Sequence, residues 1–209
     1  MKKALLFLHF VLFLLLITNK NSAQVIWTDD FESYAVDSII TPQSNQWVAR
    51  NGVGNSAKVS SDTSVSGSKS LKIWEGRPPG TIVPLSNVIR AFGDSTAGRY
   101  LLKFKVFVPD STDAGAYWHI GHSMYNPTRV QQRALQVNIA AKGRTSELTS
   151  AGKTYPFKVN YGKWAEVVHV FDLDRDSTDF FFDGTSISIV TCERKIVYTQ
   201  IVYYFYGIL

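Results

Sequence analysis

The sequence predicts an all-β protein, an antiparallel two-sheet β-sandwich that follows an N-terminal leader helix. Beyond the leader, no run places apolar residues at the i, i+3, i+4 and i+7 spacing of an amphipathic helix. Short β-branched and aromatic runs recur instead, separated by clusters of Gly, Pro, Asn, Asp and Ser. Between residues 100 and 108, Leu102, Phe104, Val106 and Val108 alternate with polar or larger residues, so they share one face of a strand. We expect this stripe to face a core.

The first 23 residues have the pattern of a cleavable secretory signal. Two lysines precede the apolar run 4–16, which is shorter than the roughly 20 residues that span a bilayer. Small residues end the leader, so we place cleavage after Ala23 and expect a mature chain beginning at Gln24. An uncleaved N-terminal anchor is the alternative. Export predicts a secreted, extracellular or periplasmic protein with no membrane span after cleavage.

The rest of the chain, residues 24–209, is long enough for one domain with a full core. Three of the 22 basic residues lie in the leader, which leaves 19 against 17 acidic residues and a mature net charge of about +2. No lysine or arginine run forms a basic face, so nucleic acid is not an expected partner. The single cysteine, Cys192, cannot form an internal disulfide, and no histidine motif frames it as a nucleophile. The fold must therefore depend on its core.

Expected strands follow one another along the mature chain. They are Val25–Phe31, Trp47–Arg50, Lys58–Ser60, Ser70–Trp74, Val83–Phe92, Tyr100–Val108, Ala116–Ser123, Ala134–Ala140, Tyr155–Val159, Trp164–Leu173 and Asp179–Phe182. A polar connection separates residues 140 and 155. Residues 174–177 predict a turn, and Asp183-Gly184 predicts a hairpin. Trp164, which begins a long apolar run, is the expected core anchor.

Several of these motifs together resemble a known superfamily. They are Asp29-Asp30-Phe31-Glu32-Ser33-Tyr34, Ser66-Gly67-Ser68-Lys69-Ser70-Leu71-Lys72-Ile73, the 100–109 strand that ends in Pro109, Gly162-Lys163-Trp164, Asp172-Leu173-Asp174 and Asp183-Gly184. Their order resembles the laminin G-like modules of secreted bacterial proteins, in the concanavalin A-like lectin/glucanase superfamily. The resemblance covers roughly residues 27–187. It implies a jelly roll that places a glycan on the concave face of one sheet.

The glucanases of this superfamily carry a Glu-x-Asp-x-x-Glu pattern on one strand, and this sequence lacks it. The nearest acidic alternation is Asp172-x-Asp174-x-Asp176, which we interpret as a solvated turn. Hydrolysis of a glycosidic bond usually needs two carboxylates. The sequence therefore predicts no catalytic residue.

Binding a glycan without chemistry needs aromatic faces and a few polar side chains. The densest candidate region is 116–126, with polar partners expected on the following strand. The predicted ligand-binding residues are Tyr117, Trp118, His119, Tyr125, Arg133, Gln136 and Asn138. On a strand, Tyr117 and His119 share one face and Trp118 the other, so either set could instead belong to the core.

Metal binding has one candidate. Jelly rolls of the kind that this chain resembles are often held together by a structural calcium ion, and calcium takes hard oxygen ligands. Asp29, Asp30 and Glu32 are the predicted ligands. His119 and His122 point to opposite faces of a strand and should not share a zinc ion. His169, inside an apolar run, is the expected core or edge histidine.

The tail departs from the family pattern. Residues 189–209 contain no Asp, Asn or Pro and end in a crowded apolar run. We hypothesise a truncated or frame-shifted C-terminus after about residue 188. The alternative is that Lys195–Tyr206 is the closing strand.

The function that the sequence predicts is a secreted, non-catalytic carbohydrate-binding or adhesion module. Two alternatives stay open: a polysaccharide hydrolase or lyase of the same fold, and a protein-interaction domain of a surface protein. Calcium is the only cofactor expected, and a polysaccharide or other glycan is the expected partner.

Overall fold

The computed structural model describes residues 24–48, 57–73, 87–112, 114–121, 133–191 and 198–204, and they form a layered all-β structure. The strands are β1 (Trp47–Val48), β2 (Lys58–Ser60), β3 (Ser70–Lys72), β4 (Asn87–Ser95), β5 (Arg99–Phe107), β6 (Ala116–Gly121), β7 (Arg133–Ile139), β8 (Ser146–Ser150), β9 (Lys153–Phe157), β10 (Trp164–Asp172), β11 (Ser177–Phe182), β12 (Thr185–Thr191) and β13 (Tyr198–Tyr204). One short 3₁₀ turn, η1 (Thr41–Gln43), precedes them. The predicted all-β sandwich is confirmed.

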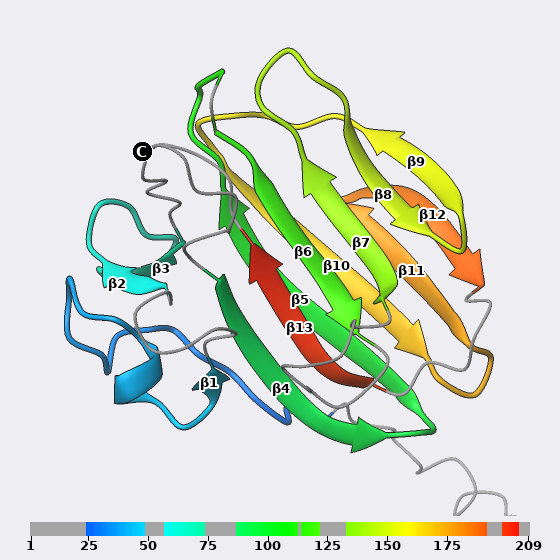
Figure 1. The fold of residues 1–209 in the computed structure, drawn as a ribbon, viewed down its shortest axis with the longest axis horizontal. Coiled ribbons are helices and arrows are strands. Elements are labelled where there is room, and N and C mark those ends of the chain that lie inside the picture. Colours follow the sequence, from blue (N-terminus) through cyan, green and yellow to red (C-terminus); the bar gives the residue numbers. More distant parts are fainter. Residues whose placement is uncertain are drawn as a thin grey trace, which may run out of the picture.

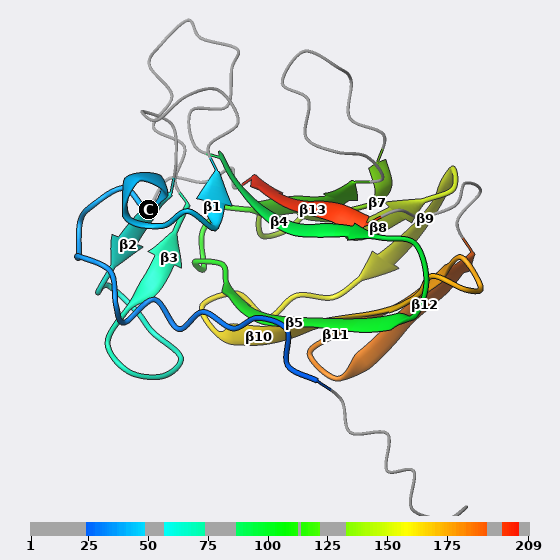
Figure 2. The same cartoon turned by 90° about the horizontal axis from the view of Figure 1, so that it is seen from below.

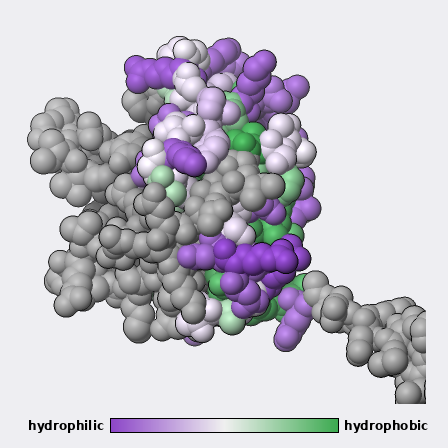
Figure 3. Space-filling model, turned by 90° about the vertical axis from the view of Figure 1, so that its right-hand side faces the viewer, coloured by the Kyte–Doolittle hydropathy of each residue, from purple (hydrophilic) through white to green (hydrophobic). Residues whose placement is uncertain are grey.

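Two antiparallel sheets face each other. The larger has the order β1-β4-β13-β6-β7-β8-β9, and the smaller has the order β12-β11-β10-β5. Figure 2 shows the two sheets as separate layers, with the two-stranded β2-β3 unit at one end. Figure 1 shows the strands of both layers running in similar directions, as in aligned sandwiches. Seen from its β9 and β12 side in Figure 3, the molecule shows apolar surface between polar regions.

The main core lies between the sheets and follows the alternation of the strands. In β10, Ala165, Val167, His169 and Phe171 are buried, whereas the residues between them are half-buried. The predicted stripe of β5 packs against the same cluster, through Val106 and, just beyond the strand, Val108, which are buried, and through the partly buried Leu102 and Phe104. A second, smaller cluster is built around Ile40, Trp47, Ala57, Val59 and Val88.

One predicted feature of this core is corrected by the structure. Trp164 is not the anchor: it is half-buried on the outer face of β10, against Phe107, with ring centroids 5.6 Å apart. Trp118 and Phe180 are the largest fully buried side chains. Trp164 begins its strand on the phase opposite to Ala165, and alternation therefore turns its indole outward.

The predicted strand Val25–Phe31 is also wrong. Residues 24–30 are irregular, and Val25 is 73% exposed. Asp29 accepts a hydrogen bond from the backbone N–H of Phe31 at 3.0 Å, and Phe31 has φ 64°. This side-chain turn competes with a strand for the backbone groups and ends any ladder at this point.

Strand β8 was not predicted, because it lies in the segment that the sequence indicates as a polar connection. Its inward residues are Ser146, Leu148 and Ser150, of which only one is apolar. Both hydroxyls have partners, since Ser146 Oγ accepts from Ala140 N–H at 3.1 Å and Ser150 Oγ donates to the Ala134 carbonyl at 2.8 Å. Hydrogen bonding removes the cost of burying them, so a polar sequence forms an inner strand here.

The predicted hairpin at 183–184 is confirmed, because Asp183 and Gly184 both have positive φ, as a two-residue type I′ turn requires. In the tail, β13 pairs with β4 on one side and β6 on the other. It forms an inner strand of the larger sheet, and Cys192 lies outside the described residues. The hypothesis of a frame shift stays a prediction.

Candidate functional site

The outer face of β6 and β7 carries the polar residues that the sequence singles out. Ala116, Trp118 and Ile120 are buried in the main core, so strand alternation turns Tyr117 and His119 to the opposite face. In register, Tyr117 lies opposite Asn138, and His119 lies opposite Gln136. The structure therefore brings together four of the predicted ligand-binding residues.

The same register continues across β8. Asn138 lies opposite Glu147, and Gln136 lies opposite Thr149. Directly opposite residues have Cβ atoms about 4.5–5.5 Å apart, so each row forms a continuous band across three strands. We name the two rows, Tyr117–Asn138–Glu147 and His119–Gln136–Thr149, the outer polar face. Glu147 and Thr149 were missed because their strand was not predicted.

Access differs along these rows. His119 is fully buried, and its ring meets that of Tyr117 edge to face with centroids 6.0 Å apart. Gln136, Asn138, Glu147 and Thr149 are half-buried. His119 therefore packs beside the Tyr117 ring on the same face of β6, whereas the β7 and β8 residues are partly exposed to solvent.

A hollow of about 540 Å³ adjoins this face at the β7–β8 turn. Its polar lining includes Asn138, Arg144, Thr112 and Thr145. A volume of this size is within the range of about 300–1,000 Å³ of ligand pockets. Arg144 is an exposed cation that sequence reasoning missed, since a lone arginine after a glycine gives no signal.

The turn that carries Arg144 is held in place. Arg144 N–H donates to the Ala141 carbonyl at 3.0 Å, and Lys142 forms an ion pair of 2.6 Å with Asp110. The hydroxyl of Tyr161 donates to the Ala140 carbonyl at 2.7 Å. These bonds fix the backbone at one rim of the hollow, so Arg144 projects from a rigid base.

The remaining predicted ligand-binding residues lie elsewhere. The prediction that Trp118 binds a ligand is wrong, because Trp118 is fully buried and its indole N–H donates to His169 inside the core. Its position in the strand points it inward, away from any ligand on the outer face. Arg133 begins β7 opposite Gly121, and nothing more of it is described. Tyr125 lies outside the described residues.

The three predicted calcium ligands make separate hydrogen bonds. Asp29 accepts from Phe31 N–H, from the Tyr34 hydroxyl at 2.9 Å and from the Trp47 indole at 2.8 Å. Asp30 accepts from Glu32 N–H at 3.1 Å. Among the described residues, no group of three or more His, Cys, Asp or Glu gathers as a metal site.

Glu32 instead clamps the loop before β3. Its carboxylate accepts from the backbone N–H groups of Ser68 and Lys69, both at 2.8 Å, and from the Ser68 hydroxyl at 3.0 Å. The Ser68 backbone N–H is the main reason why the pKa of Glu32 lies below its ordinary value. These hydrogen bonds use three of the roughly four lone-pair sites of the carboxylate. The calcium site stays a prediction.

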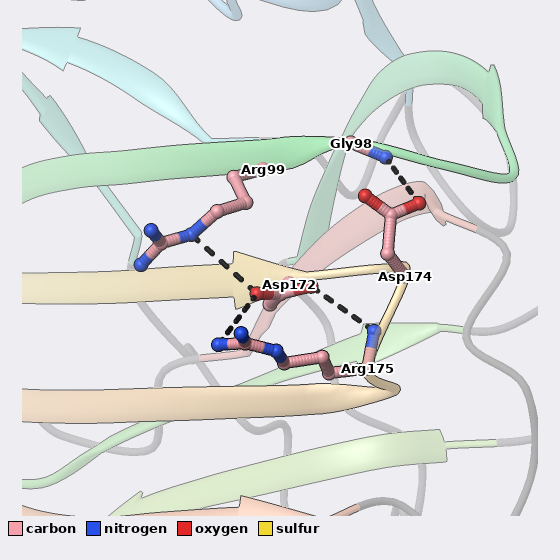
Figure 4. Close-up of polar contacts among 5 residues, drawn as sticks. All are labelled: Gly98, Arg99, Asp172, Asp174 and Arg175. Carbon is pink, nitrogen blue, oxygen red and sulfur yellow. Dashed lines mark hydrogen bonds and ion pairs between the residues drawn. The ribbon is translucent and has the colours of Figure 1, made fainter.

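The acidic alternation at the end of β10 leads into a turn, as predicted, but Asp172 is buried and not solvated. Asp172 accepts from Arg175 N–H at 3.0 Å and faces the guanidinium groups of Arg99 and Arg175 at 3.6 and 3.8 Å (Figure 4). Asp174 accepts from Gly98 N–H at 3.1 Å. These bonds close the β10–β11 turn and tie it to the β4–β5 turn.

Glu147 is the only carboxylate on the outer face of β6–β9 in the described part of the chain. Glycosidases that work through two carboxylates need a second one within about 5–9.5 Å. The outer face of β6–β9, as far as it is described, therefore offers polar contacts and one acid.

A second cavity, of about 470 Å³, was not predicted. It lies where the N-terminal segment and β3 meet β5, and Trp27, Trp47, Trp164 and Phe107 contribute to its walls. Trp164 Nε1 donates to Thr63 Oγ1 at 3.3 Å, which links β10 to the loop after β2. Sequence reasoning missed it because its walls come from five segments that are separate in the sequence.

Comparison with known proteins places this architecture in the jelly-roll class of β-sandwiches. A non-specific endo-β-1,3(4)-glucanase of family GH16 is similar over 89% of this chain and 81% of its own, with a TM-score of 0.53 and 10% identity. A sialidase is similar over 83% of this chain, with a TM-score of 0.52 and 13% identity. This chain spans only 15% of the sialidase's length. At these identities the likeness shows the fold alone.

No family model matches the sequence, and no curated protein matches it. Among the described residues, no helix is long and apolar enough to cross a membrane. The particular function must therefore be argued from the site.

Proposed function

We propose that this protein is a non-catalytic carbohydrate-binding module that holds a glycan on the outer polar face. The observation that carries the proposal is the meeting of the Tyr117–Asn138–Glu147 row with the hollow that Arg144 lines. A glycan presents hydroxyls and CH faces, and amides, a carboxylate, a guanidinium and an aromatic ring are the groups that recognise them.

The fold supports the choice of ligand class. Two solved proteins of this fold are named as a glucanase and a sialidase, so glycans are the first class to test. The single carboxylate of the described outer face favours binding over hydrolysis. Hydrolase or lyase activity and a protein-interaction role are the alternatives that the same experiment addresses.

The test measures binding of soluble β-1,3-glucan, mixed-linkage glucan and alginate by affinity electrophoresis and calorimetry. At least one polysaccharide should bind, and Asn138→Ala or Arg144→Ala should weaken that binding about tenfold, the effect of losing one or two polar contacts. Arg175→Ala, an exposed arginine in the β10–β11 turn, is the matched control and should bind as the native chain does.

Three results would count against this function. New reducing ends would indicate a hydrolase, and a new unsaturated product would indicate a lyase. Absence of binding across a glycan array would favour a protein-interaction domain.

Three expectations from the sequence continue as proposals. Export through the leader supports a secreted or periplasmic location. The ordered motifs support a laminin G-like module. Calcium at Asp29, Asp30 and Glu32 would be supported by a rise in Tm on adding millimolar calcium chloride, compared with EDTA.

A further inference from the structure

The cavity of about 470 Å³ follows the edge of β5. Six consecutive residues, Leu102 to Phe107, line it. Successive side chains of a strand point to opposite faces, so a cavity lined by all of them runs along the edge of the strand. Strand β5 is the last strand of its sheet in the described part of the chain, paired there with β10 alone.

The opposite wall belongs to the small β2-β3 unit and the N-terminal segment. Residues 70–73, together with Trp27 and Phe31, line this wall. Leu71 and Ile73 pack against the small core, whereas Leu102 and Phe104 pack against the main core. The cavity is therefore a slot between two separate apolar clusters, and an occupant would bridge them.

The outward face of β5, beside the slot, carries two lysines. Lys103 and Lys105 are exposed and alternate with the inward residues of β5. Glu166 lies opposite Lys105 in register and forms an ion pair of 2.7 Å with Lys103. These two lysines share one carboxylate, which leaves about one positive charge on this face of β5. Across the slot, Asp62 is paired with Lys72, and Asp29, Asp30 and Lys69 also line the wall.

We propose that the edge of β5 accepts an extended peptide strand from a partner protein. The incoming strand adds to the four-stranded sheet through main-chain hydrogen bonds, since an open edge presents a row of backbone donors and acceptors. Its apolar residues face Leu102, Phe104 and Val106, and its acidic residues face Lys103 and Lys105. The partner segment therefore alternates acidic and apolar residues over about six positions.

The chemistry of the slot favours a peptide over a glycan. Apolar groups make up most of the slot's exposed surface, although the β2-β3 wall also carries Asp62, Thr63 and Ser70, so a glycan would bury much of its surface against groups that form no hydrogen bond. A strand satisfies its own polar groups along the β5 backbone and turns side chains to the walls. This site is separate from the outer polar face, which belongs to the other sheet.

The test uses four fluorescein-labelled six-residue peptides and the full chain, measured by fluorescence polarisation. The first alternates glutamate and valine, and the second has glutamine for glutamate. The third and fourth are the first peptide with its odd-numbered or its even-numbered backbone nitrogens methylated. The first should bind. The second should bind about fivefold more weakly, as expected for two lost exposed charge pairs, and methylation in one phase should weaken binding more than about tenfold.

Variants locate the site. The double variant K103Q/K105Q should bind the glutamate and glutamine peptides equally. The matched control, K153Q/K158Q, removes two exposed lysines of and beside β9 and should keep the preference. Absence of binding, equal binding of the methylated peptides, or an unchanged preference in K103Q/K105Q would each overturn the proposal. A lack of glycan binding leaves it unaffected.

Discussion

The indole N–H of Trp118 donates a hydrogen bond of 3.1 Å to Nε2 of His169, and this bond joins the inner faces of the two sheets. Both residues are fully buried. Because Nε2 accepts, the imidazole carries its proton on Nδ1. The ring of His169 stacks against Phe171, with centroids 5.6 Å apart and an interplanar angle of 3°. A neutral histidine is thus part of the aromatic core.

Acid should destabilise the fold through His169. Burial lowers its pKa from 6.5 to about 3, so the unfolded chain takes up this proton at a higher pH than the folded chain does. Between about pH 6.5 and 3 the unfolded state therefore binds more protons, and the free energy of unfolding should fall by about 1.4 kcal/mol per pH unit from this group.

Urea unfolding at several pH values measures this slope. His169→Phe removes the titrating group and keeps an aromatic ring of similar shape, at the cost of an unpaired Trp118 indole of about 1–3 kcal/mol. The variant should be less stable at pH 8 and less sensitive to acid between pH 6.5 and 5. Equal slopes for the two proteins would show that His169 is not the cause.

Gly67→Ala should lower stability more than Gly152→Ala. Both glycines have positive φ, 63° and 72°, where an alanine costs about 1–2 kcal/mol. A Cβ on Gly67 would lie 2.5 Å from Glu32 Oε1, whereas a Cβ on Gly152 meets nothing within 4 Å. The clash would displace the carboxylate that clamps Ser68 and Lys69. Thermal unfolding measures the Tm of both variants. An equal fall in Tm would argue that the hydrogen bonds of Glu32 to Ser68 and Lys69 do not stabilise the fold.

Replacing Trp118 by alanine should lower the free energy of unfolding more than replacing Trp164 does. Trp118→Ala removes a fully buried indole and should cost about 3–5 kcal/mol. Trp164→Ala removes a half-buried indole from the outer face and should cost less. Denaturant unfolding measures both, and an equal or larger loss at Trp164 would restore it as a core anchor.

Export should yield a mature chain that begins at Gln24. The chain expressed in a bacterium with its leader should appear outside the cytoplasm, and N-terminal sequencing or intact mass should locate the cut after Ala23. Replacing Ala23 with a bulky residue should slow cleavage. A product that keeps residues 1–23 would favour the uncleaved anchor.

How far the sequence predicts this fold depends on how apolar each strand is. In β5, inward and outward residues differ in polarity, so period-two alternation reveals the strand, whereas β10 is largely apolar on both faces and is indicated by its run of apolar and β-branched residues. In β8 the inward Ser146 and Ser150 are polar, and their partners lie on β7 (Ala134) and directly after it (Ala140). Hydrogen bonds to another strand leave no pattern in the local sequence.

The candidate site shows the same limit. The sequence indicated Tyr117, Gln136 and Asn138, because aromatic and amide residues gather there. It left open which face of β6 is inward, and it missed Glu147 and Arg144. Their relation to Asn138 comes from strand pairing and a turn, which only the assembled sheet contains.

By itself, the sequence determined the strand periodicity, the turns at 174–177 and 183–184, and a core free of disulfides among the described residues. These are local properties, because one residue's backbone preferences and its neighbours' polarity specify them. The tertiary structure alone decided that Trp118 is inside, that Trp164 is outside and that β13 lies between β4 and β6. Burial depends on what packs opposite a side chain, and that partner is far away in the sequence.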